Sequence, residues 1–240
     1  MLRDVDRDIW VAEQPFRYFG LSIGTRMTVI RLDNQELVVI SPIQITNELS
    51  SQLEELGTVQ HIIAPNLYHY LFAADFKAAY PHATFWAVPG LETKQPNLAI
   101  DQIIPQNGNS PWNGLESVML DGFRTVGVAR FDDLNECVLF HAASRTLILT
   151  DTAFNFDESF PLITQLATRI VGSYNTLSPS LLEQVATHDK QAVKAAVERV
   201  LRWDFERVIV AHGSIVEQNG KERFKQGYER FLGQTLGAAV

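Results

Sequence analysis

The sequence has little of what several protein classes require. Its single cysteine, Cys137, cannot form a disulfide within the chain. No stretch is rich in lysine or arginine, and 28 acidic against 20 basic residues give a net charge of −8, which repels nucleic acid and anionic membrane surfaces. No apolar run approaches the ~18 to 20 residues that cross a bilayer. We therefore expect no nucleic-acid partner and no membrane association.

Familiar catalytic motifs are also missing. The sequence contains no Gly-x-Ser-x-Gly elbow, no Walker loop and no Gly-x-Gly-x-x-Gly fingerprint, so it lacks the parts of a serine hydrolase, a nucleotide hydrolase or a dinucleotide-dependent dehydrogenase. Cys137 lies in the apolar run ECVLF, which is typical of an inert buried thiol. The first eight residues, MLRDVDRD, lack the apolar stretch of a signal peptide. Together with the cysteine count, this predicts that the protein resides in a reducing cytoplasm.

The composition that remains is that of a well-cored globular protein. The 240 residues are 46% hydrophobic and 20% charged, and a chain of this size can bury roughly 70 to 75% of its unfolded surface. We predict one domain spanning residues 1–240 that needs no metal to fold. Any metal would therefore serve chemistry.

Hydrophobic patterns predict the order of the secondary structure. Strands are predicted at 9–11, 27–32, 37–41, 59–64, 83–88, 115–120, 124–128, 137–141, 146–150 and 207–211. Helices are predicted at 46–57, 70–80, 160–171, 190–203 and in a final segment that ends at Phe231. Thr46 is expected to cap the first helix and Gly57 to end it in a left-handed conformation. The twice-repeated order of strands before helices favours two packed sheets with helices on both outer faces.

Three strands run into a polar side chain near their carboxyl ends. His69 follows the strand 59–64, Asp151 follows 146–150, and His212 follows 207–211. Rigid scaffolds gather reactive groups at such positions, although each residue alone is an ordinary loop or turn residue. The three together indicate a candidate site.

This arrangement resembles the metallo-β-lactamase-like superfamily over nearly the whole chain. That superfamily has a four-layer αββα sandwich in the α/β class and carries a His-x-His-x-Asp-His motif after a strand. Residues 62–87 resemble the motif strand, loop, helix and next strand, LTDTAF (149–154) resembles the segment of the bridging aspartate, and VAHG (210–213) resembles the final histidine segment. The resemblance implies the same fold here.

The resemblance also implies an incomplete metal centre. The motif positions read Ala64, Asn66, Tyr68 and His69, and the third-histidine position falls in a stretch with acidic residues and no histidine. One metal site of the superfamily thus loses its ligands. The other keeps three positions, which read His69, Asp151 and His212. Ala-Pro-Asn in place of His-x-His is similar to an uncharacterised branch of the superfamily that is grouped as a domain of unknown function.

Two interpretations stay open from the sequence. In the first, the protein holds no metal and is not a catalyst. The pocket that holds the metal centre in the superfamily binds a small molecule, or the irregular connection 92–113 binds a partner. In the second, His69, Asp151 and His212 hold one Zn or Fe ion that activates water against an ester, phosphoester or lactone.

Further candidates accompany these ligands. Tyr68 and Glu136 are candidate catalytic residues, with an exposed edge-strand charge as the alternative for Glu136. Candidate pocket residues are Asn66, Asn135 and Asn155. The sequence does not identify the substrate or the oligomeric state.

Overall fold

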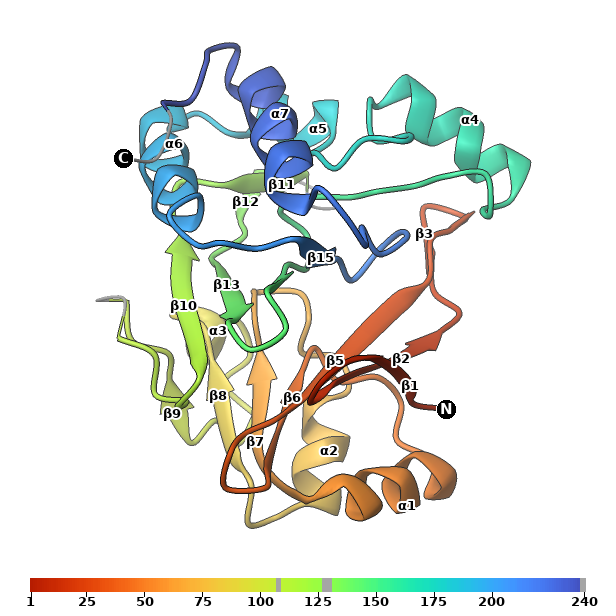
Figure 1. Cartoon of the computed structure of the whole chain (residues 1–240), viewed down its shortest axis with the longest axis vertical. Helices are drawn as coiled ribbons and strands as arrows, with labels where there is room; N and C mark the ends of the chain where they lie inside the picture. Colours follow the sequence, from red (N-terminus) through yellow and green to blue (C-terminus); the bar gives the residue numbers. More distant parts are fainter. Residues whose placement is uncertain (107–108, 127–130, 238–240) are drawn as a thin grey trace.

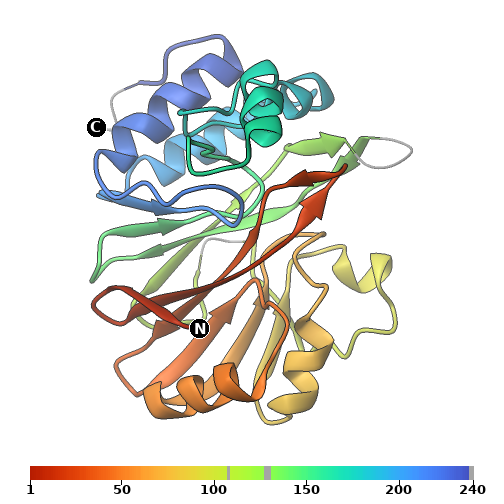
Figure 2. The same ribbon diagram turned by 90° about the vertical axis from the view of Figure 1, so that its right-hand side faces the viewer.

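The chain folds into two β-sheets that pack face to face, with helices on both outer faces (Figures 1 and 2). The computed structural model describes residues 1–106, 109–126 and 131–237. Parts of the predicted connection 92–113 and of the predicted strand 124–128 therefore lie outside the described residues.

The first sheet has seven strands in the order β1-β2-β5-β6-β7-β8-β9. The strands are β1 (Arg3–Asp6), β2 (Ile9–Gln14), β5 (Thr25–Arg31), β6 (Glu36–Ile40), β7 (Thr58–Ala64), β8 (Thr84–Ala87) and β9 (Gln102–Ile103). Pairing is antiparallel from β1 to β6 and parallel from β6 to β9. Helices α1 (Asn47–Leu56) and α2 (Ala73–Ala79) cover its outer face, and α3 (Leu91–Lys94) follows β8. A short hairpin of β3 (Arg17–Tyr18) and β4 (Leu21–Ser22) separates β2 from β5.

The second sheet has four strands in the order β10-β13-β14-β15. These strands are β10 (Leu115–Leu120), β13 (Glu136–His141), β14 (Thr146–Ile148) and β15 (Arg207–Ile209). Its outer face is covered by α6 (Lys190–Val200) and α7 (Gly220–Leu232). Helices α4 (Leu162–Ile170) and α5 (Leu181–Ala186) and the two-stranded ribbon of β11 (Arg124–Val126) and β12 (Phe131–Asp133) complete this half of the protein.

Strand alternation produces three separate apolar cores, which is why the protein has four layers. In β6, Leu37 and Val39 pack towards α1, whereas Val38 and Ile40 pack between the sheets. In β13, Val138 faces α6 and α7 while Leu139 faces the first sheet. Successive residues of a strand point to opposite faces, so each inner strand contributes to two cores. The predicted αββα architecture is confirmed.

Most predicted elements are present, and one local expectation is wrong. Thr46 caps α1 by accepting from the Leu49 amide, as predicted. Gly57 ends that helix, but its backbone is extended rather than left-handed (φ 160°). Glycine is required there because a Cβ would lie 2.4 Å from the Gln35 carbonyl oxygen. Helix α5 was not predicted.

Within the described residues, no helix is both long enough and apolar enough to cross a membrane.

Candidate metal centre

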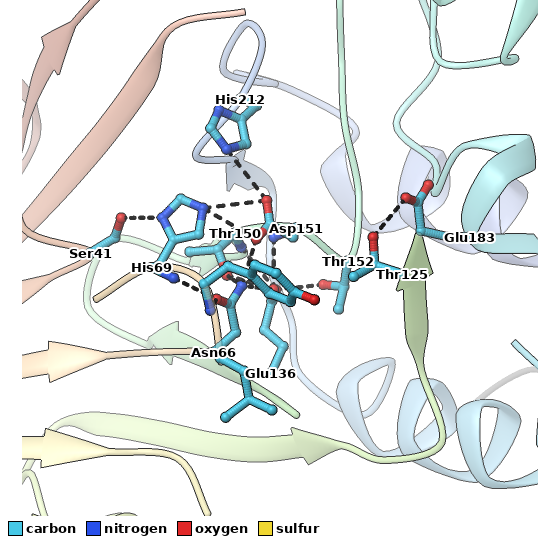
Figure 3. Close-up of polar contacts among 12 residues, drawn as sticks. Ser41, Asn66, His69, Thr125, Glu136, Thr150, Asp151, Thr152, Glu183 and His212 are labelled. Atoms are coloured by element: carbon cyan, nitrogen blue, oxygen red, sulfur yellow. Dashed lines mark hydrogen bonds and ion pairs between the residues drawn. The ribbon is translucent and has the colours of Figure 1, made fainter. Parts of the chain in front are cut away.

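Three side chains from separate strand ends converge on one point (Figure 3). His69 follows β7, Asp151 follows β14, and His212 follows β15. His69 Nε2 lies 3.2 Å from Asp151 Oδ2 and 3.3 Å from Oδ1. His212 Nε2 lies 3.4 Å from Asp151 Oδ1. One ligating atom from each residue lies within 4.8 Å of the other two, so the structure brings together the three residues that the sequence singled out.

Each histidine is oriented through its other ring nitrogen. His212 Nδ1 lies 2.6 Å from the carbonyl oxygen of Gly24. A carbonyl only accepts, so Nδ1 carries the proton and, in the neutral ring, Nε2 keeps its lone pair towards Asp151. His69 Nδ1 lies 2.6 Å from Ser41 Oγ, which is able to play the same part for the second ring. Histidines that bind metals are oriented by partners of this kind.

The loop that carries His212 is fixed from the first sheet. The Arg26 guanidinium, buried at the inner end of β5, donates to the carbonyl oxygens of Val210 and Gly213 on either side of His212. Gly213 adopts φ 108°, and a Cβ there would lie 2.5 Å from the Asn155 carbonyl oxygen. Asn155 in turn donates to the Ser214 carbonyl oxygen at 2.9 Å. Arg26 was missed by sequence reasoning, because nothing in the sequence pairs β5 with a loop that follows some 185 residues later.

Asp151 is positioned by a buried glutamate. Glu136 Oε1 accepts from the Thr150 amide at 2.8 Å and from Thr152 Oγ1 at 2.6 Å. Its Oε2 accepts from the Asp151 amide at 2.7 Å, from Thr150 Oγ1 at 2.5 Å and from Asn66 Nδ2 at 3.0 Å. The expectation of an exposed edge-strand charge is wrong, because β13 lies inside its sheet and Glu136 is 0% exposed. These contacts favour a positioning role for Glu136 over proton transfer.

Asn66 joins the histidine segment to Asp151. Its Nδ2 donates to Asp151 Oδ2 at 2.8 Å, and its Oδ1 accepts from the amides of Tyr68 and His69, both at 2.8 Å. The side chain is fully buried. Asn135 donates from Nδ2 to the Pro89 carbonyl oxygen at 2.9 Å. Asn66, Asn135 and Asn155, predicted as pocket residues, hold loops together and are not among the residues that line the cavity described below.

The three residues of the cluster also couple electrostatically. Burial opposes ionisation of Asp151, but the two imidazoles outweigh it and hold the pKa of this carboxyl well below its ordinary value. Burial likewise opposes protonation of His69, but the Asp151 carboxylate outweighs it and raises the pKa of His69. Without an ion, the cluster is thus held by charge as well as by geometry.

Tyr68 lies beside the cluster and points elsewhere. Its hydroxyl donates to Asp132 Oδ2 at 3.1 Å. Burial and this hydrogen bond raise the pKa of Tyr68 further above the ordinary value of a phenol, so the proton is retained at neutral pH. Tyr68 therefore presents a hydrogen-bond donor near the cluster rather than a fourth anionic ligand.

A cavity of about 300 Å³ opens in front of the cluster and is lined by His69, Asp151 and His212. Six aromatic side chains also line it: Phe16, Tyr18, Tyr68, Tyr70, Phe72 and Phe154. Thr125 and Glu183 contribute polar groups, and Thr125 Oγ1 donates to Glu183 Oε1 at 3.2 Å (Figure 3). The cluster is thus accessible to a small molecule.

The donor set fits one divalent ion. Bonds of about 2.0 to 2.1 Å in a tetrahedral zinc site place neighbouring ligand atoms about 3.3 to 3.4 Å apart. The contacts of His69 and His212 with Asp151, at 3.2 to 3.4 Å, already have this spacing. Two imidazoles and one carboxylate leave a coordination position open, as catalytic sites do. The same donors suit Zn²⁺ or Fe²⁺.

The sandwich and the placement of this cluster at its strand ends define a protein of the metallo-β-lactamase fold. Solved structures with the same fold include a metallo-β-lactamase from Pontibacter korlensis, which is 12% identical, with a TM-score of 0.64 and coverage of 95% of this chain and 98% of that one. The FIM-1 metallo-β-lactamase from Pseudomonas aeruginosa in its mono-zinc form is 10% identical, with a TM-score of 0.62 and coverage of 97% and 96%. The Flv1 flavodiiron core from Synechocystis sp. PCC6803 is 12% identical, with a TM-score of 0.64 and coverage of 97% and 60%. At these identities the likeness establishes the fold alone.

The family is defined more narrowly by the sequence. Residues 6–174 match the profile of the domain of unknown function DUF4336, so the chain belongs to this family. No curated protein matches the chain. The predicted resemblance is thereby confirmed for the family of unknown function and for the metallo-β-lactamase fold.

Proposed function

We propose that the protein is a hydrolase with a single divalent metal ion held by His69, Asp151 and His212, acting on an ester, phosphoester or lactone. The observation that carries the proposal is the convergence of two imidazole Nε2 atoms on one carboxylate at 3.2 to 3.4 Å. Both Nδ1 atoms are engaged elsewhere, by Ser41 and Gly24. Such orientation of the rings is what a metal ligand needs and what simple packing does not require.

The surroundings of Asp151 support one ion rather than two. The Asn66 amide donates to Asp151 Oδ2, on the side where a second ion would share this carboxylate. Ala64, at the end of β7, offers no ligand atom and is fully buried. An N–H group directed at this oxygen opposes a cation there, so the proposed centre is degenerate relative to a two-metal site.

The residues of the chain divide the work of such a site. A divalent ion bound here supplies Lewis acidity, which acidifies water and polarises a substrate oxygen. Ser41 and the Gly24 carbonyl oxygen hold the two rings, while Glu136 and Asn66 hold Asp151. Tyr68 lines the cavity, and its hydroxyl would donate to a substrate oxygen if it exchanged Asp132 for the substrate.

A second candidate is a non-catalytic binding protein that uses the same cavity. The observation in its favour is that Asp151 has partners without an ion: Asn66 donates to its Oδ2, and the His69 ring, whose pKa the carboxylate raises, donates to it when protonated. A hydrogen-bonded cluster of this kind is stable in a buried site. The two candidates differ in one measurable property, the metal content of the purified chain.

The test is the metal content of protein purified without a His tag or chelator, measured by mass spectrometry of the elements. We expect about one Zn or Fe per chain, lost together in His69→Ala and His212→Ala, because both rings bind the same ion. His82→Ala is the matched control, since His82 is exposed and lies outside the cluster. A metal-free native chain that stays metal-free after supplementation with Zn²⁺ and Fe²⁺ would favour the binding protein.

A further inference from the structure

The cavity in front of the cluster combines aromatic walls with carboxylates. Besides the six aromatic rings, Leu71 and Leu134 line it. Its ionisable lining groups away from the two histidines and the tyrosines are Asp151 and Glu183, and the described part of the chain contributes no lysine or arginine to the lining. Lys94 lies over the Tyr68 ring, with Nζ 3.6 Å from the ring centroid, but does not line this cavity. Away from the two histidines and any ion that they hold, a negatively charged ligand group would find no cation in the lining.

The second carboxylate is held by neutral groups. Glu183 is buried and accepts from the Ser180 amide at 3.0 Å and from Thr125 Oγ1 at 3.2 Å. Because Glu183 lies away from the cluster of His69, Asp151 and His212 in Figure 3, it extends the negative character of the cavity beyond Asp151. Buried carboxylates oppose another negative charge nearby, since little water remains to screen it.

The apolar character continues to the mouth of the cavity. Tyr18 and Leu71 line the cavity and are still 46% and 58% exposed. Phe19 packs edge-on against Tyr18 and is 71% exposed. A volume of about 300 Å³ is at the lower end of the range for ligand pockets, which is roughly 300 to 1,000 Å³. One or two rings, or a short aliphatic chain, match this space.

We propose that the cavity binds an uncharged aromatic or aliphatic group of the substrate and discriminates against a negative charge in that group. The inference rests on the proposed function for the reacting bond, which would lie at the cluster. The selectivity of the cavity comes from its own walls and needs no metal. Among the ester, phosphoester and lactone substrates, it favours esters and lactones with an apolar substituent, because aromatic stacking and burial stabilise such a group.

The experiment compares two probes of nearly equal shape and different charge, 1-naphthaleneacetamide and 1-naphthaleneacetate. Each is titrated by its naphthalene fluorescence into the whole chain after chelator treatment, at pH 7.5. We expect the amide to bind at least tenfold more tightly than the acetate. In Leu71→Lys, which adds a cation at the mouth, the ratio should fall at least threefold. Leu162→Lys is the matched control, because Leu162 is 76% exposed on α4 and does not line the cavity, and its ratio should not change.

Each outcome decides the inference separately from the proposed function. Equal affinity for the two probes, no saturable binding of either, or the same ratio in Leu71→Lys as in the native chain would overturn the selectivity. The metal measurement is made on a different sample, so a chain that binds the amide selectively but holds no metal would retain the cavity's ligand class and lose the hydrolase.

Discussion

Replacing Glu136 by glutamine tests whether the buried network builds the site. Five donors converge on the two carboxylate oxygens of Glu136. The glutamine amide must direct its NH₂ group at one of these two sets. If it faces the Oε1 side, the Thr152 hydroxyl can turn to accept, but the Thr150 amide loses its acceptor. If it faces the Oε2 side, the Asp151 amide loses its acceptor, while Asn66 keeps Asp151 and Thr150 as acceptors.

At least one buried backbone N–H is therefore left without a partner in either orientation. An unsatisfied buried donor costs about 1 to 3 kcal/mol, and neutral hydrogen bonds are weaker than those to a carboxylate by about 1 kcal/mol. We expect Glu136→Gln to lower the free energy of unfolding by about 2 to 4 kcal/mol, which for a chain of this size lowers the melting temperature by about 5 to 15 °C. Metal affinity should fall as well, because Asp151 loses its anchor.

The assay is urea unfolding followed by tryptophan fluorescence, with the free energy taken from the linear extrapolation. Glu55→Gln, on the exposed face of α1, is the control and should change the free energy by no more than about 0.5 kcal/mol. If Glu136→Gln also stays within this limit, the five contacts do not hold Asp151, and the account of how the site is built fails.

Two further predictions concern groups away from the cluster. Burial lowers the pKa of His61 against the opposing effect of Glu36. Trp86 Nε1 donates to His61 Nδ1 at 3.2 Å, which favours the neutral ring. The unfolded chain therefore takes up a proton at His61 below a pH of about 6.5, where the folded chain does so only at lower pH. The contribution of His61 to stability is present above that pH and is lost as the pH falls towards the folded pKa. Between pH 7.5 and 5.5, the free energy of unfolding should therefore fall less in His61→Gln than in the native chain. An equal fall in both would contradict this. In α7, a Cβ on Gly227 would lie 1.9 Å from the Leu177 carbonyl oxygen, whereas Gly233 has φ 69° and nothing within 4 Å. Gly227→Ala should cost about 3 kcal/mol and Gly233→Ala about 1 to 2 kcal/mol, as measured by urea unfolding; equal costs would show that the close approach is relaxed without strain.

The fold was predictable because the hydrophobic pattern of each strand and helix depends only on a short stretch of sequence. The alternation of Leu37, Val38 and Val39 places residues on two faces whatever the rest of the chain does. Helix α5 was missed because it has only six residues and leaves Leu181, Leu182 and Val185 about half exposed or more, so it has no clear buried stripe. The capping box at its start, in which Ser180 and Glu183 bond to each other's backbone, is the signal that could have found it.

The site was only partly predictable because its supports come from distant segments. His69, Asp151 and His212 follow strands and match a known pattern, so position alone singled them out. Arg26 lies inside an apolar strand, and its contacts with Val210 and Gly213 depend on how the two sheets pack. The sequence around Glu136 is typical of an exposed charge. Its side chain is buried only because β10 and β14 flank its strand, which the local sequence does not reveal.

Asp151 shows how geometry divides the chemistry of the site. Its Oδ2 accepts from the Asn66 amide at 2.8 Å and lies 3.2 Å from His69 Nε2. Its Oδ1 faces both histidine Nε2 atoms, at 3.3 and 3.4 Å. The Asn66 N–H directed at Oδ2 opposes an ion on that side of the carboxylate. An ion between Oδ1 and the two Nε2 atoms would gain three ligands when both rings present their lone pairs. Asn66 Oδ1 also accepts from the amides of Tyr68 and His69. The same side chain therefore opposes a second ion at Asp151 Oδ2 and positions His69 for the proposed single ion. Asn66 thus joins the His69 loop to Asp151 in both candidate functions, and the metal content of the purified chain distinguishes them.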